Sequence, residues 1–253
     1  DAVNNRPAAD NPWYNTEDNF IQNGTPGSWG ADFNHDSSYT KDFVKDVLTY
    51  WMEEYQIDGF RFDFTKGFSN TIYQEDWNWG SAYDADRIAI LKDYADHVWD
   101  FDPTDKPYVI LEHLAENSEE TVLANYGMLL WGKMNWPYAQ SLIGDVNSSD
   151  ISGMSYKNRG WQKAGLVGFM ESHDDDRLMH YMKTDGKSNS NYNIREENTA
   201  LARQAMAGLF LFSIPGPKMI WQFGELGYDI SQEVNGETGR KPIHWDYLDN
   251  DHR

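Results

Sequence analysis

The sequence predicts an α/β protein with a parallel sheet, and three observations support this prediction. From about residue 40 onward, apolar patterns with helical spacing alternate with short extended ones, which is typical of strands joined by right-handed helical crossovers. Acidic residues follow three of the expected strands, where α/β folds place functional groups. The length of 253 residues suits two domains or one α/β barrel.

The composition excludes several classes of protein. Aromatic residues make up 15% of the chain, so general disorder is ruled out. The net charge of −20 argues against a nucleic-acid partner and against an anionic membrane surface. No apolar run approaches the length of a membrane span. The absence of cysteine excludes disulfides, thiolate zinc sites and a cysteine nucleophile.

The first two elements after an irregular start are a helix and a strand. Residues 1–39 carry scattered turn-forming residues without periodicity, whereas 40–56 repeat apolar residues at helical spacing. Residues 57–64 alternate strictly, which predicts a strand with Arg61 and Asp63 on one face. The opposite face carries three aromatic rings, Phe60, Phe62 and Phe64.

The remaining elements follow from caps and apolar runs. Three residues mark helix starts, Asp84 and Ser118 as N-caps and Pro137 in a first turn. A longer apolar helix is expected over 196–212, and a loop over 147–163. Strands are expected over four further segments, 108–111, 128–131, 166–170 and 218–223.

Three carboxylates stand at or just after the ends of separate predicted strands: Asp63, Glu112 and Asp174. Each also has a structural interpretation. Asp63 could pair with Arg61, Glu112 could cap the following turn, and Asp174 could belong to a solvated acidic run. Because the acids recur at the same end of successive parallel strands, together they favour a site.

A pair of carboxylates can hydrolyse a glycosidic bond, one ionised to attack the anomeric carbon and the other protonated for the leaving oxygen. Arg61 beside Asp63 would favour the ionised form of that acid. An ionised Asp63 would in turn raise the proton affinity of Glu112. A third carboxylate can stabilise positive charge on the sugar. Arg61, Lys66 and His173 could donate hydrogen bonds to sugar hydroxyls.

Four segments resemble, in order, motifs of the alpha-amylase family of glycoside hydrolases, namely 58–66, 109–113, 169–177 and 215–227. Residues 32–34 are similar to the motif that closes the inserted domain of that family. The resemblance implies a partial TIM (β/α)8 barrel, comprising about strands 4 to 8. Residues 1–39 would be the remnant of the inserted domain, and 40–253 the C-terminal part of the barrel.

The resemblance also implies a retaining mechanism on α-1,4-glucan. Asp63 would be the nucleophile, Glu112 the acid and base, and Asp174 the stabiliser of the transition state. Four residues would bind substrate, Arg61, Lys66, His173 and Arg177. No cofactor is needed for this chemistry, and an extracytoplasmic location follows family habit. Transglycosylation within the same family is an alternative reaction.

The chain also departs from the family pattern. Residues 1–6 mimic its first motif, but Arg6 stands where the family has histidine, so the segment is interpreted as part of the inserted domain. Gly67 replaces a histidine that in the family helps to hold a structural calcium ion. Asp32 is the candidate match among those metal ligands.

Two other classes of function were weighed against the enzyme. A non-catalytic carbohydrate-binding or regulatory barrel is disfavoured because all three acids are present. A metal triad of the same acids is disfavoured because Arg61 would oppose a bound cation. A barrel without its first strands exposes sheet edges, so residues 1–253 alone are expected to be poorly stable and inactive.

Overall fold

The structure is a computed structural model that describes residues 10–15, 32–71, 80–236 and 238–249. Within these residues the chain forms six α-helices and four β-strands, and the strands follow one another in the sheet as β1-β2-β3-β4. The chain divides into two compact units, Asp1–Trp131 and Gly132–Arg253. The α/β class and the parallel pairing expected from the sequence are confirmed.

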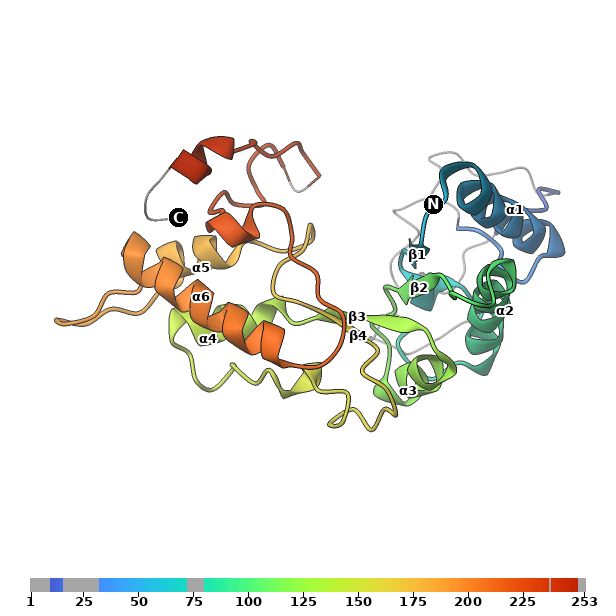
Figure 1. Cartoon of the computed structure of the whole chain (residues 1–253), viewed down its shortest axis with the longest axis horizontal. Helices are drawn as coiled ribbons and strands as arrows, with labels where there is room; N and C mark the ends of the chain where they lie inside the picture. The colour runs from blue at the N-terminus through green and yellow to red at the C-terminus, as the bar shows by residue number, and fades with distance from the viewer. Residues whose placement is uncertain (1–9, 16–31, 72–79, 237, 250–253) are drawn as a thin grey trace. The chain divides into compact units, whose positions relative to one another are not determined.

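The first unit contains, in chain order, α1 (Ser38–Tyr55), β1 (Gly59–Phe62), α2 (Ala85–Phe101), β2 (Tyr108–Leu111) and α3 (Asn117–Tyr126). Strands β1 and β2 pair in parallel along their full length, and β2 pairs in parallel with β3 (Leu129–Lys133). Helix α2 packs against both α1 and α3 (Figure 1). Gly59 permits the close start of β1 on β2, because a Cβ there would lie 2.4 Å from the carbonyl oxygen of Tyr108.

The second unit contains α4 (Asn135–Ile143), β4 (Leu166–Phe169), α5 (Leu178–Asp185) and α6 (Glu197–Ser213). The three helices pack on one another (Figure 1). All four residues of β4 are buried, as expected of a strand inside an α/β fold. No helix among the described residues combines the length and apolar character needed to cross a membrane.

Four details of the sequence prediction are corrected. Helix α3 begins at Asn117 with Glu116 as its N-cap, so Ser118 lies inside the first turn and does not cap it. Phe64 leaves the face of β1, because the strand ends at Phe62 and Phe64 takes a left-handed conformation. Helix α5 has no counterpart in the prediction.

The fourth correction concerns the strand expected over 218–223. The structure has there a single parallel bridge between Gly168 and Lys218. Two hydrogen bonds make it, from the N–H of Gly168 to the oxygen of Pro217 (2.9 Å) and from the N–H of Met219 to the oxygen of Gly168 (3.0 Å). The segment therefore lies alongside β4 without building a ladder of its own.

Candidate active site

The candidate site in the first unit starts from Arg61, which joins the two acids that follow β1 and β2. Its Nη1 forms an ion pair with Oδ1 of Asp63, and its Nη2 lies 2.8 Å from Oε2 of Glu112. The ring of Trp131 lies beneath the guanidinium, 5.0 Å from it. The pairing of Asp63 with Arg61 that the sequence allowed is therefore present, and Glu112 shares the same cation.

The two carboxylates differ in their exposure. The side chain of Asp63 is 77% exposed, whereas that of Glu112 is buried. Glu112 extends the pairing of the strands, because its N–H donates to the oxygen of Phe62 at 2.9 Å. The two carboxylates therefore lie in different environments, although both contact the same arginine.

The loop after β1 supports the buried carboxylate. The N–H of Phe64 donates to Oε2 of Glu112 at 3.0 Å. Phe64 has φ 42° and ψ 48°, a conformation that is unfavourable for a residue with a side chain. The contacts around it must therefore hold this turn in place, and functional sites are where such turns concentrate.

Lys66 lies within the short 3₁₀ turn Thr65–Gly67 and is buried. Its Nζ donates to Oγ of Ser81 at 3.2 Å and lies 5.4 Å from the ring centre of Phe64. The ammonium is thus directed into the first unit in this structure. Its expected contact with an acceptor sugar stays a prediction.

The second unit carries Asp174 and His173. The side chain of Asp174 is 45% exposed, and Nε2 of His173 lies 3.2 Å from its Oδ1. The N–H of Asp174 donates to Oγ of Ser172 at 3.2 Å. The rings of His173 and Trp221 lie 5.7 Å apart. This arrangement offers a hydrogen-bonding pair next to a flat apolar face, a combination that suits a sugar ring.

Arg177, expected to bind substrate, is buried in an ion pair, and its contact with a substrate stays a prediction. Its Nη1 lies 3.2 Å from Oε2 of Glu171, and its Nη2 donates to the oxygen of Gln222 at 3.0 Å. Glu171 also accepts a hydrogen bond from the N–H of Leu178, which begins α5. Burial raises the pKa of Glu171 despite the neighbouring cation, and burial lowers the pKa of Arg177. This pair ties the segment after β4 to the segment after the Lys218 bridge.

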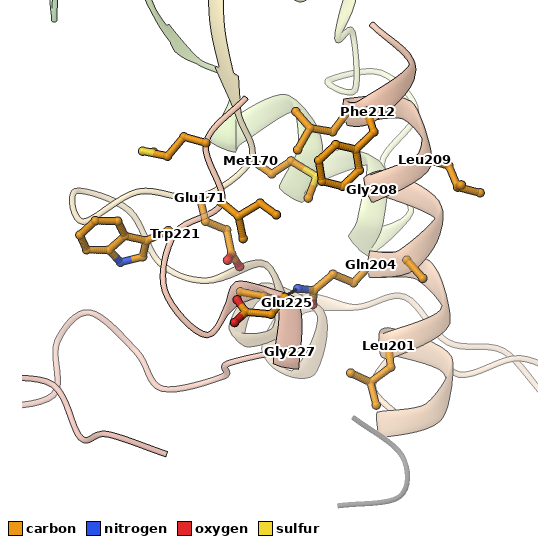
Figure 2. A pocket seen from close by; sticks show the side chains of 15 residues that line it. Met170, Glu171, Leu201, Gln204, Gly208, Leu209, Phe212, Trp221, Glu225 and Gly227 are labelled. Atoms are coloured by element: carbon orange, nitrogen blue, oxygen red, sulfur yellow. Dashed lines mark hydrogen bonds between the residues drawn. The ribbon is translucent and has the colours of Figure 1, made fainter. Parts of the chain in front are cut away.

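A pocket of about 430 Å³ lies between α6 and the segment 219–227. Figure 2 shows the side chain of Gln204 reaching into it from α6 and that of Glu171 from the segment after β4. Most of its other lining residues are apolar, among them Leu209, Phe212 and Met219. Because the lining is mostly apolar, the pocket favours apolar packing over sugar binding. Neither His173 nor Asp174 lines it.

Asp32, the candidate calcium ligand, lies in a network of asparagine side chains, whereas calcium takes six to eight oxygen ligands. Asn15 donates through Nδ2 to Oδ2 of Asp32 (3.1 Å) and to Oδ1 of Asn70 (2.9 Å). Nδ2 of Asn70 in turn donates to Oδ1 of Asn34 at 2.8 Å. One amide N–H thus points at the carboxylate, Gly67 offers no side chain, and the described residues contain no cluster of three acidic, histidine or cysteine ligands. Calcium binding at Asp32 stays a prediction.

Sequence reasoning did not single out a buried group of polar side chains in the first unit. Arg87, His113 and Glu119 are fully buried, and Glu119 contacts both of the others. The available signals were weak: His113 follows Glu112 directly, and Glu119 is an acid in the first turn of a predicted helix. Neither signal indicates the arginine, which lies 32 residues before Glu119.

Solved structures of other proteins share the fold of this chain. No protein-family model and no curated protein matches the chain. A pullulanase from Anoxybacillus sp. LM18-11, solved with maltotetraose, matches 94% of the chain with a TM-score of 0.61 at 17% identity. A sucrose 6F-phosphate phosphorylase from Thermoanaerobacter thermosaccharolyticum matches 85% with a TM-score of 0.57 at 15% identity.

A maltogenic alpha-amylase from Thermotoga neapolitana matches 87% of the chain with a TM-score of 0.53 at 14% identity. The chain spans 34% of the pullulanase, 43% of this amylase and 48% of the phosphorylase, which is less than half of each. Likeness at such low identity establishes the fold. The chain therefore has part of the fold of enzymes of the alpha-amylase family.

Proposed function

We propose that the chain carries the catalytic acids of a retaining glycoside hydrolase that acts on α-1,4-linked glucan. The observation that carries the proposal is the shared contact of Arg61 with exposed Asp63 and buried Glu112 after adjacent parallel strands. Two pullulanases of similar fold were solved with maltotetraose and with maltose, which supports an α-glucan as the substrate class.

In the proposed mechanism, a carboxylate oxygen of Asp63 forms a bond to the anomeric carbon while the glycosidic C–O bond breaks. Glu112 gives its proton to the departing oxygen and then takes a proton from the water that releases the sugar from Asp63. Asp174 would bind hydroxyls of the distorted sugar and stabilise the positive charge that develops on it. His173 would donate to the same sugar.

The domain assignment belongs to the same proposal. Residues 1–39 are proposed to come from an inserted domain and 40–253 from the C-terminal part of the barrel. Activity is therefore expected of a form of the protein that contains all eight strands. The fold match, which spans less than half of each reported enzyme, supports this assignment.

The direct test replaces Asp63 by asparagine in that complete form and measures release of reducing ends from soluble starch. Asp63→Asn removes the nucleophile at constant size, so we expect activity to fall by about three orders of magnitude or more. Asp100→Asn is the matched control, because Asp100 is an exposed acid near the end of α2. Its activity should equal that of the wild type.

Two outcomes would change the assignment. Unchanged hydrolysis in Asp63→Asn would overturn the role of Asp63. A wild-type protein that binds starch without any turnover would favour a carbohydrate-binding or regulatory barrel instead. Chromatography of the products separates hydrolysis from transglycosylation, since only transfer yields oligosaccharides longer than the starting one.

A further inference from the structure

We propose that a buried hydrogen-bonded network positions Glu112 for proton transfer to the leaving group. We call it the Glu119 network, and its members are Arg87, Glu119, His113 and Thr65. The inference rests on the proposed function, because it assigns positioning residues to the acid and base of that reaction. None of these four side chains is expected to touch the sugar, since all are buried.

The network begins at an ion pair with two parallel contacts. Nε of Arg87 lies 2.7 Å from Oε1 of Glu119, and Nη2 lies 2.7 Å from Oε2. The N–H of Asp84 donates to the same Oε2 at 2.8 Å. Burial alone would raise the pKa of Glu119, but hydrogen bonds from His113 and Arg87 hold that pKa below its usual value. Glu119 is therefore an ionised acceptor at neutral pH.

The ionised carboxylate selects one form of His113. Nε2 of His113 lies 2.9 Å from Oε1 of Glu119, and an ionised carboxylate can only accept, so Nε2 carries a proton. Burial lowers the pKa of His113, which keeps the ring neutral. Nδ1 is then an acceptor, and it lies 2.9 Å from Oγ1 of Thr65.

Thr65 passes this orientation on to Glu112. Its hydroxyl lies 2.9 Å from Nδ1 of His113 and 3.1 Å from the main-chain oxygen of Glu112. The single hydroxyl proton is assigned to the ring, because the neutral Nδ1 can only accept. Its main-chain N–H donates to the oxygen of Glu112 at 2.9 Å. The preceding N–H, that of Phe64, donates to the carboxylate of Glu112. The side chain of Thr65 therefore fixes a turn whose amides hold both the backbone and the carboxylate of the proposed acid.

Arg87 holds the same turn from its other end. Its Nη1 donates to the oxygens of Lys66 and Gly80, each at 2.7 Å, and its Nη2 donates to the oxygen of Ala82 at 2.8 Å. The left-handed Phe64 thus stands between two fixed points, the Glu112 main chain and the Lys66 carbonyl. Because the turn is strained at Phe64, loss of either tie should let the Phe64 N–H move away from the carboxylate.

The test compares substrates that need proton donation with substrates that do not. In the complete form of the protein, Thr65→Val removes the hydroxyl at nearly constant shape. We expect kcat/KM on a maltooligosaccharide to fall roughly 10- to 100-fold, a part of what general acid catalysis supplies. The kcat/KM on a 2,4-dinitrophenyl α-maltoside should fall much less, because kcat/KM reports the bond-breaking step alone and that leaving group departs without a proton. Glu112→Gln should show the same pattern more strongly.

A second pair of residues provides the control. Thr49 on α1 and His97 on α2 form a similar contact in the first unit, with Oγ1 and Nε2 2.9 Å apart. This contact lies outside the turn that holds Glu112. Thr49→Val should leave the ratio of the two rates unchanged. Equal losses on both substrates in Thr65→Val would show a merely structural role and overturn the inference.

A spectroscopic measurement tests the network without any turnover. With ¹⁵N-labelled histidine, the wild-type protein should show His113 protonated at Nε2 and unprotonated at Nδ1, and Thr65→Val should shift the Nδ1 resonance most. A proton on Nδ1 in the wild type would overturn the network even if Thr65→Val fails to fold. A wild type that shows the expected tautomer but hydrolyses neither substrate overturns the proposed function, and with it the role in proton transfer.

Discussion

At the scale of single residues, His35 shows how burial sets a charge state. Its ring stacks on Phe68 with centroids 3.9 Å apart, and its Nδ1 lies 2.9 Å from the hydroxyl of Tyr94. Burial lowers the pKa of His35 from 6.5 to about 3. The neutral ring therefore belongs to the apolar packing of the first unit, and protonating it requires that packing to open.

This predicts a specific pH dependence of stability. Because the pKa of His35 is lower in the folded than in the unfolded protein, the unfolded chain binds the proton first. The stabilising contribution is complete above pH 6.5 and is lost as the pH falls toward 3. The slope contributed is at most about 1.4 kcal/mol per pH unit.

Denaturant unfolding at several pH values between 7 and 4 measures this slope, and His35→Gln should make it shallower. His113 shifts in the same direction, so some slope remains in the variant. Superimposable pH profiles of wild type and His35→Gln would contradict the assignment to His35.

The positions of Asp63 and Glu112 were predictable because strand periodicity and strand ends are local properties of the sequence. Residues 57–64 alternate, so Arg61 and Asp63 had to share a face. The burial of Arg177 and the contact of Arg87 with Glu119 were not predictable in this way. They depend on residues far apart in the chain, which no local period connects.

At the scale of elements, accuracy followed the strength of the local signal. The segment 108–111 is a short apolar run and forms β2 with the same limits, and α2 begins after Asp84 as expected. Helix α5 has only eight residues, too few for a clear apolar period. Whether the segment 218–223 forms a strand depends on pairing with neighbouring strands, which its own sequence does not specify. In the described residues it pairs with β4 at one bridge.

The N-cap of α2 gives a prediction at this scale. One oxygen of Asp84 accepts from the N–H groups of Asp86 and Arg87, at 2.9 and 3.2 Å, and the other accepts from the hydroxyl of Ser69. Asp84→Ala leaves these donors unpaired, so we expect a loss of about 1–2 kcal/mol in the free energy of unfolding. Glu116 at the N-cap of α3 makes no such bond. Glu116→Ala should cost less, and equal losses in thermal melts would refute the capping argument.

At the scale of the whole molecule, the second unit presents an apolar surface next to its pocket. Leu209 is 75% exposed, and Phe210, Phe212 and Ile220 are more than half exposed. Leu209, Phe212 and Ile220 also line the pocket between α6 and the segment 219–227. Exposed apolar side chains gathered in this way mark a surface that a binding partner, a ligand or further protein structure covers.

Under the proposed barrel assignment, we expect strands and helices outside residues 1–253 to provide that cover. If so, residues 1–253 alone should bind an apolar dye such as anilinonaphthalene sulfonate and should melt below the complete form. They should also fail to hydrolyse starch, because Asp63 and Asp174 would lack the scaffold that positions them together. The dye signal should be lower in a form that contains all eight strands, because the surface around Leu209 would be buried there. Robust hydrolysis by residues 1–253 would show that the acids need no further strands. Equal dye binding by both forms would show that the surface around Leu209 stays exposed to solvent in the complete form.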